Sequence, residues 1–154
     1  MRLLAGTSGY AFKEWKGSFY PSDCKDDAML GLYAGQFGAV EINNTFYRLP
    51  KEQVLLDWAA QVPDTFTFAL KASQRITHHA RLKEECADTV DFLLKNTAAL
   101  GDRLGPILFQ LPPNLKKDTD RFRGFLGLLP SDRRYVFEFR HESWFDDEIY
   151  EAMR

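Results

Sequence analysis

The chain has 154 residues, 45% of them hydrophobic and 27% charged, which is typical of one globular domain with its own core. Its net charge of −2 gives no overall sign of nucleic-acid or membrane binding, although a local basic patch is compatible with it. The N-terminal stretch MRLLAGTSGY is too short and too weakly apolar for a signal peptide, and no run approaches the roughly 18 apolar residues of a membrane span. Cys24 and Cys86 have no metal-binding spacing, so we expect a cytoplasmic protein with two reduced thiols and no membrane partner.

Apolar periodicity and the positions of Gly and Pro predict strands and helices that alternate along the chain. The first strand covers residues 2–6, and a Gly-containing loop and a polar-aromatic segment lead to a helix at 26–36. The next elements are a strand at 39–43, a helix at 50–61 and a strand at 65–71. A polar loop, SQRITHHARLK, precedes a helix at 84–100, a strand at 106–111, a helix at 118–129, a strand at 133–139 and a last helix that begins near Trp144.

This strict alternation of strand and helix predicts a parallel α/β sheet with right-handed crossovers. Two architectures compete, a doubly wound open sheet and a (β/α)₈ barrel. In each strand after the first, alternate residues form one apolar side, as Phe66, Phe68 and Leu70 do, and the other side turns polar towards the C-terminal end. A doubly wound sheet should be apolar on both sides, whereas a barrel needs one apolar side and can build a polar site at its mouth. The pattern therefore favours the barrel.

Five motifs occur in order along the chain: GTSGY…EWKGSFYP, VEINNTFYRLP, KAS…ITHHARL, GPILFQLPP and FEFRHESW. Together they resemble the DUF72 family, also called YecE-like proteins, and the resemblance extends from about Leu3 to Trp144. It implies a TIM-barrel-like fold with a site at the mouth of the barrel, and the family has no firmly established biochemical activity.

The resemblance also bears on the length of the chain, because family members usually continue with further βα units. It implies that residues 1–154 are a single, incomplete TIM-barrel-like domain of about five βα units. A truncation or a gene fragment is the favoured interpretation, and a natural half-barrel that needs a partner is the alternative. Such a form would leave open sheet edges and an exposed inner face, through which we expect self-association.

The C-terminal ends of the strands in a closed barrel meet at one mouth, where barrel enzymes place their catalytic residues. We take four residues at these ends as candidates for chemistry: Glu41, Lys71, His78 and Glu138. The candidates for substrate binding are Asn43, Tyr47, Arg48, Arg81, Gln110, Arg140, His141 and Trp144.

Each candidate also has a structural alternative. Glu41 and Glu138 could divide acid and base roles if their environments separate their pKa values, or could balance nearby cations in a buried network. Arg48 and Arg140 match bidentate binding of phosphate or carboxylate, with a salt bridge as the alternative. Lys71 could act as a general base or a Schiff-base nucleophile if burial lowers its pKa, or could be paired with a carboxylate.

The histidines and aromatic residues complete this interpretation. No HxH, HExxH or other zinc spacing is present, and neighbouring side chains such as His78 and His79 usually diverge, so we expect neither a metal site nor a cofactor. His78 and Arg81 fit the THxxRL pattern of the family, which implies a role for His78 rather than His79. Trp58 is expected in the core.

Three functions are compatible with these residues. The first is an enzyme, a hydrolase, lyase or isomerase, that uses metal-free acid/base chemistry on a small anionic substrate containing phosphate or sugar. The second is a barrel that binds or processes nucleic acid, for which salt-dependent oligonucleotide binding would be the test. The third is a non-catalytic binding or scaffold protein, in which Glu41→Gln and Glu138→Gln would change only thermal stability. The fold alone does not choose among them.

Overall fold

Five parallel strands form one sheet in which the order of the strands follows the order of the chain. The computed structural model describes residues 3–154. The strands are β1 (Gly6–Ser8), β2 (Ala39–Ile42), β3 (Thr67–Lys71), β4 (Leu104–Gln110) and β5 (Tyr135–Glu138). A doubly wound sheet reverses its strand order at a switch point, whereas barrel strands follow one another without reversal. The order 1-2-3-4-5 is therefore that of a TIM-barrel-like wall, as the alternating strand faces predict.

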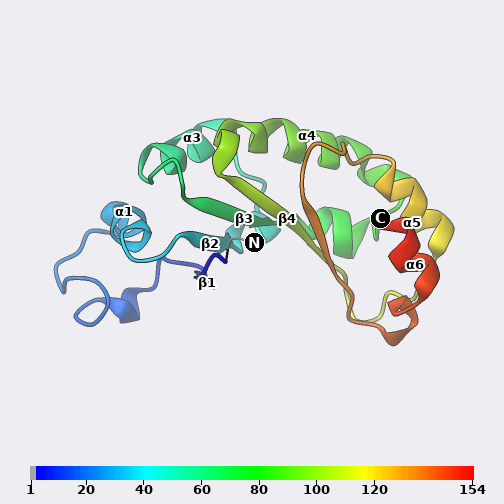
Figure 1. The fold of residues 1–154 in the computed structure, drawn as a ribbon, viewed down its shortest axis with the longest axis horizontal. Coiled ribbons are helices and arrows are strands. Elements are labelled where there is room, and N and C mark those ends of the chain that lie inside the picture. Colours follow the sequence, from blue (N-terminus) through cyan, green and yellow to red (C-terminus); the bar gives the residue numbers. More distant parts are fainter. Residues whose placement is uncertain (1–2) are drawn as a thin grey trace.

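The helices lie along one side of this sheet, which curves away from them (Figure 1). The α-helices are α1 (Met29–Ala34), α2 (Asn44–Tyr47), α3 (Glu52–Ala60), α4 (Ala87–Thr97), α5 (Thr119–Leu126) and α6 (Asp147–Ala152). In Figure 1, α3 and α4 arch over β3 and β4, and α5 and α6 lie beside β5. No helix of residues 3–154 combines the length and the apolar content that crossing a membrane requires.

The side of the sheet under the helices holds the core. Phe68, Leu70, Ile107 and Phe109 are fully buried there, whereas Val136 on the opposite side is 45% exposed. Two clusters make up this core, one around β2 and β3 with α1 and α3, and one around β4 and β5 with α4, α5 and α6. The predicted alternation of strand faces is confirmed, and it leaves the inner side of the sheet for the polar residues.

Three local predictions need correction. The first strand, predicted at residues 2–6, is β1 at Gly6–Ser8, and Arg2 lies outside the described residues. A Cβ atom at Gly6 would lie 1.9 Å from the carbonyl oxygen of Ala39, so only glycine allows β1 to pair with β2 at this position. The predicted polar loop contains a π-helical turn at Arg75–His79, and helix α2 lies in a segment for which no helix was predicted. Buried Ile76 anchors the π-helical turn to the core, which the polarity of the segment conceals.

Candidate functional site

Polar side chains gather at the C-terminal ends of β2 to β5, as the barrel prediction requires. The register places Ile42 of β2 beside Leu70 of β3, and Gln110 of β4 beside Glu138 of β5. Leu70 pairs with Ile107, three residues before Gln110, so the ends of β4 and β5 reach further along the sheet than those of β2 and β3. We call this edge the rim. On it, Glu41 lies near the end of β2 and Asn43 follows β2, Lys71 ends β3, and Arg140 follows β5.

Glu138 is held by two neighbours on the rim. Its carboxylate accepts hydrogen bonds from Gln110 Nε2 and from Arg140 Nε, both at 2.7 Å. Burial alone would raise the pKa of Glu138, but these hydrogen bonds and the charges of Arg140 and Lys71 bring the pKa below its usual value. Glu138 is therefore ionised at neutral pH, which fits an electrostatic or positioning role better than that of a general acid.

Lys71 and His78 both contact the Phe46 ring. The Lys71 ammonium lies 4.8 Å from the centre of the Phe46 ring, a cation–π distance, and the His78 imidazole packs edge-to-face against the same ring at 5.0 Å. Lys71 forms no ion pair with any carboxylate of residues 3–154. Phe46 thus holds next to an imidazole a cation that has no direct ion pair in residues 3–154, a role that sequence reasoning missed.

His78 lies in a setting that keeps it uncharged. Burial lowers its pKa below the usual 6.5, and the positive charges of Lys71, Arg140, His79 and Arg81 lower it further. The Thr77 hydroxyl lies 2.9 Å from Nδ1 and orients the ring. A neutral imidazole on the rim can accept a proton, so His78 is the general-base candidate that the geometry supports.

The backbone around His78 is unusual in two ways. His78 lies in the π-helical turn Arg75–His79, where the Ala80 amide donates to the Arg75 carbonyl at 3.0 Å. Arg81 and Leu82 follow with positive φ angles of 53° and 61°, a conformation that is costly for side-chain-bearing residues. Arg81 in turn donates to Asn114 at 2.7 Å. π-Helical turns and strained backbone cluster at functional sites, which adds independent weight to this segment.

Glu41 belongs to a separate network at the β1 side of the rim. Its carboxylate accepts a hydrogen bond from Ser8 Oγ at 2.8 Å, and Ser8 Oγ accepts one from Asn43 Nδ2. β2 and β5 are three positions apart in the sheet, which corresponds to roughly 14 Å along it. The predicted division of acid and base roles between Glu41 and Glu138 therefore finds no shared hydrogen-bond network in residues 3–154.

Within the described residues 3–154, the side chains of four predicted binding residues form no hydrogen bond or ion pair with Lys71 or Arg140. Tyr47 and Arg48 are exposed and line an outer groove with Phe92 of α4. His141 Nδ1 accepts a hydrogen bond from the Ser143 amide and caps the turn Glu142–Trp144. Trp144 is only 1% exposed, stacks on Phe139 at 5.0 Å and donates to the Leu115 carbonyl at 2.6 Å, so it supports the core rather than the mouth.

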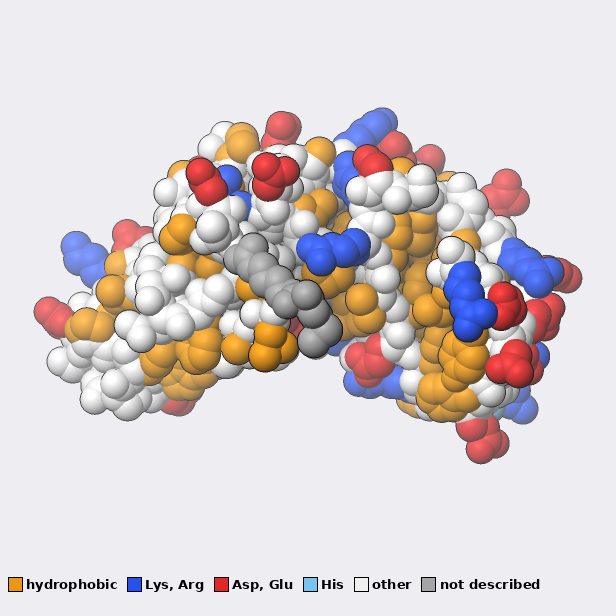
Figure 2. All heavy atoms as spheres, in the orientation of Figure 1, with side chains coloured by type: hydrophobic (Ala, Val, Ile, Leu, Met, Phe, Trp, Pro, Cys, Tyr) orange, Lys and Arg blue, Asp and Glu red, His pale blue; other side chains and the backbone are white. Residues whose placement is uncertain are grey.

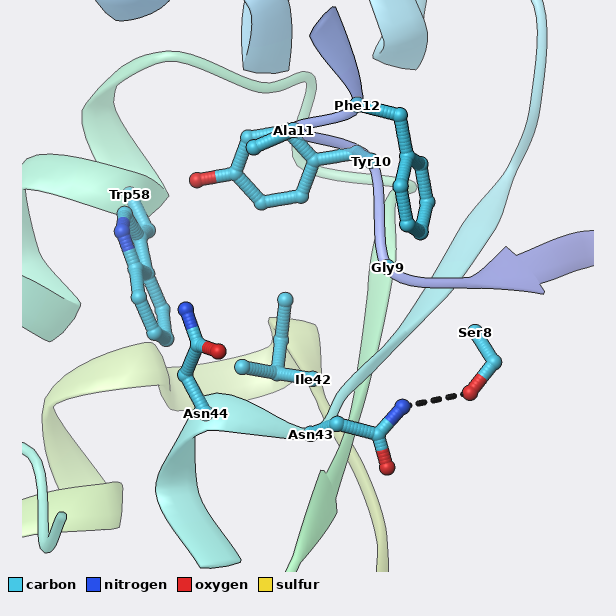
Figure 3. A pocket seen from close by; sticks show the side chains of 9 residues that line it. All are labelled: Ser8, Gly9, Tyr10, Ala11, Phe12, Ile42, Asn43, Asn44 and Trp58. Carbon is cyan, nitrogen blue, oxygen red and sulfur yellow. Dashed lines mark hydrogen bonds between the residues drawn. The ribbon is translucent and has the colours of Figure 1, made fainter. Parts of the chain in front are cut away.

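A cavity of about 260 Å³ lies over the ends of β1 and β2 (Figure 3). Its lining consists of Ser8, Gly9, Tyr10, Ala11, Phe12, Ile42, Asn43, Asn44 and Trp58. Trp58 packs one face on Phe68 in the core, as predicted, and also borders the cavity. The position of Tyr10 and Asn44 directly after two strand ends was the signal that could have pointed to this cavity.

The described residues 3–154 form neither a group of metal ligands nor a disulfide. Within residues 3–154, no three His, Cys, Asp or Glu side chains are grouped as metal ligands would be. Cys24 and Cys86 are free, buried thiols that belong to different core clusters.

Comparisons with known proteins give a consistent result. The family model described as "Protein of unknown function DUF72" matches residues 4–154. The chain is 37% identical to the UPF0759 protein YecE of Escherichia coli K12 over 117 residues. This match covers 75% of this chain and 43% of the E. coli protein. It is 32% identical to the UPF0759 protein YunF of Bacillus subtilis over 143 residues, a match that covers 87% of this chain and 50% of the B. subtilis protein.

Two solved structures resemble the whole chain. A DUF72 family protein from Thermotoga maritima superposes with a TM-score of 0.76 at 29% identity, over 96% of this chain and 59% of that one. A DUF72 family protein from Enterococcus faecalis has a TM-score of 0.73 at 18% identity, which shows likeness of fold alone, over 96% of this chain and 54% of that one. The chain thus spans about half the length of the relatives that it matches, between 43% and 59%.

Proposed function

The chain belongs to the DUF72 family, and from that premise we propose that its rim is an enzyme active site that binds a small anionic substrate through Lys71 and Arg140. The observation that carries the proposal is the charge balance around His78. Lys71, Arg81 and Arg140 all act on this imidazole, whereas Glu138 is already hydrogen-bonded to Arg140. One anionic group of a substrate would supply the missing negative charge.

The same arrangement suggests a proton-transfer reaction. Because its pKa lies below the usual 6.5, His78 is uncharged at neutral pH and can accept a proton. An anion bound between Lys71 and Arg140 would offset the charges that lower the pKa of His78, so substrate binding itself would strengthen the base. Glu138 would keep Arg140 in place through its 2.7 Å hydrogen bond. Hydrolase, lyase and isomerase reactions all contain such a step, and no metal or cofactor enters the proposal.

The setting that we propose for this reaction is the cytoplasm. Cys24 and Cys86 are both free, buried thiols, and reduced thiols of this kind are usual in that compartment.

Titration with inorganic phosphate, followed by calorimetry, tests the anion site. We expect Lys71→Met and Arg140→Met each to weaken phosphate binding about tenfold, because each removes one charge-assisted contact. Lys95→Met is the matched control, since Lys95 is an exposed cation on α4 paired with Asp91. Unchanged phosphate affinity in both rim variants, or the same loss in Lys95→Met, would refute the anion site.

A second candidate function, nucleic-acid binding, is favoured by a groove on the outer side of the molecule. The groove measures about 410 Å³ and is lined by Tyr47, Arg48, Leu49, Lys51, Arg75, Asp88, Thr89 and Phe92. Tyr47 is 72% exposed, and exposed aromatic rings beside cations are the elements that single strands bind. A single-stranded oligonucleotide should then bind with an affinity that falls steeply with salt and that Arg48→Met lowers. An absence of binding at low salt would exclude this candidate.

A further inference from the structure

Arg81 is a half-buried cation just after the π-helical turn that carries His78. Its guanidinium donates a hydrogen bond to Asn114 Oδ1 at 2.7 Å, and Asn114 belongs to the loop that follows β4. Arg81 forms no ion pair with any carboxylate of residues 3–154. The partner that holds Arg81 in place is thus a neutral amide, which leaves the charge of the guanidinium intact.

The backbone on both sides of this hydrogen bond is anchored in the core. Arg81 and Leu82 have positive φ angles, and Leu82 is only 2% exposed, while its amide donates to the Ile76 carbonyl at 3.0 Å. Asn114 precedes Leu115, whose side chain is also buried. Arg81 is therefore held in place before any ligand arrives, and a preorganised charge needs no costly rearrangement when an anion binds.

Three cations act on His78, and only one of them has a carboxylate as a direct partner. Arg140 pairs with Glu138 at 2.7 Å. Lys71 and Arg81 have no such partner in the part of the chain that the structure describes, residues 3–154. Each of the three cations lowers the pKa of His78, so their charges act at the same place. Two positive charges at this place thus lack a direct counter-charge.

Contacts also place these groups close together. The Lys71 ammonium and the His78 imidazole lie 4.8 Å and 5.0 Å from the centre of the same Phe46 ring. The charge of Lys71 also lowers the pKa of Glu138, the partner of Arg140. A ligand anion at Lys71 and Arg140 therefore lies within the field of all the cations that act on the imidazole.

We propose that the rim selects an anion with two negative charges, the phosphate group of a phosphomonoester, and that Arg81 is the residue that sets this preference. The inference rests on the proposed function, because it takes the anion site at Lys71 and Arg140 as the place where the phosphate binds. A phosphomonoester carries two negative charges at pH 8, since its second pKa is about 6, whereas a sulfate monoester or a carboxylate carries one. Arg81 acts through its charge, so it needs no direct contact with the ligand.

Two probes of the same shape and different charge test this preference. They are methyl phosphate and methyl sulfate, each titrated into the whole chain by calorimetry at pH 8 and constant ionic strength. Both are tetrahedral monoesters, so differences in size do not enter the comparison. We expect methyl phosphate to bind at least about tenfold more tightly than methyl sulfate, because only methyl phosphate supplies a second negative charge.

Variants at two positions test the role of Arg81. Arg81→Gln removes its charge, and Asn114→Asp, at an exposed position, pairs it with a carboxylate; each should reduce the preference for methyl phosphate to within about threefold. Asn114→Ala removes the hydrogen bond but leaves the charge, so it should keep most of the preference. Lys95→Met is the matched control, because it changes the net charge by the same amount at an exposed site on α4 and should keep the preference.

The outcomes distinguish this inference from the function on which it rests. Equal affinity for the two probes, with binding that depends on Lys71 and Arg140, would overturn the selection of a doubly charged anion and leave the anion site standing. A preference that persists in both Arg81→Gln and Asn114→Asp would overturn the role of Arg81. If Arg81→Gln fails to fold, Asn114→Asp carries this test. Binding of neither probe would overturn both the inference and the anion site.

Discussion

The two faces of the sheet differ in what covers them. Under the helices, aromatic side chains interlock, as Phe109 does with Phe125 at 5.1 Å and Phe137 at 5.3 Å. On the inner face, Ala39, Thr67 and Leu108 are only half-buried, and charged groups follow at the rim. Figure 2 shows that most charged side chains ring the outer edge of the molecule in this view, while apolar ones reach the surface nearer its middle.

Each strand therefore has one face that stabilises the core and one face that carries the candidate site. Neighbouring residues of a strand point to opposite sides, so each strand contributes both to the core and to the inner face. In β4, Phe109 serves the core, and the next residue, Gln110, holds Glu138 at the rim. Substitutions one position apart should therefore affect different properties of the protein.

The largest expected effect follows from exchanging one residue on each face of β4. Phe109→Ala should lower the free energy of unfolding by about 3–5 kcal/mol, because it leaves a cavity in a fully buried aromatic cluster. Leu108→Ala, its neighbour on the inner face, should cost about 1 kcal/mol, because its side chain is only half-buried. Urea denaturation followed by circular dichroism measures both. Equal losses would show that the inner face is covered as well as the outer one.

The second prediction concerns what the open inner face contacts. We propose that two copies of this chain associate through the inner face and the free edge of β5, since no strand of residues 3–154 pairs there. Val136→Lys should weaken self-association at least about tenfold in sedimentation experiments, because it puts a charge on this face. Leu56→Lys on α3 is the matched control, with 43% exposure against 45% for Val136. A wild-type chain that stays monomeric at all concentrations would contradict the proposal.

Part of this contrast was predictable from the sequence. Strand faces follow a two-residue period, so the buried side of β2 to β5 and the rim positions of Lys71, Gln110, Glu138 and Arg140 could be assigned from local pattern alone. The pairing of Gln110 with Glu138 also follows, because the two residues are level in a parallel sheet.

Other features depend on contacts that no local pattern encodes. Trp144 follows a strand end as a rim residue would, yet its indole bonds the Leu115 carbonyl, 29 residues earlier in the chain. Phe46 is one aromatic residue among many until the fold brings its ring into contact with both Lys71 and His78. The cavity likewise forms only when the fold brings together Tyr10 and Trp58, which lie far apart in the sequence.

The smallest predicted effect is a change in the pKa of His78, which depends on the positive charges of the rim. Nuclear magnetic resonance should give His78 a pKa below 6.5, and Lys71→Met or Arg140→Met should raise it towards that value, because each removes a positive charge. Added phosphate should raise it as well. Lys95→Met should leave it unchanged, and a His78 pKa that no rim substitution moves would separate the imidazole from these cations.

The sign of the effect on stability follows from the same pKa. Since folding lowers the pKa of His78, the unfolded chain binds a proton first as the pH falls through 6.5. His78 therefore makes the folded state less stable below about pH 6.5 and has no such effect above it. His78→Gln should flatten the pH dependence of the unfolding free energy below pH 6.5. Added phosphate should reduce the same pH dependence in the unchanged chain, because a bound anion offsets the cations that lower the pKa of His78. A histidine among cations that bind an anion should show both responses: a flatter pH dependence after His78→Gln and a smaller one after phosphate addition. The two measurements together therefore test whether the inner face contains an anion-binding site.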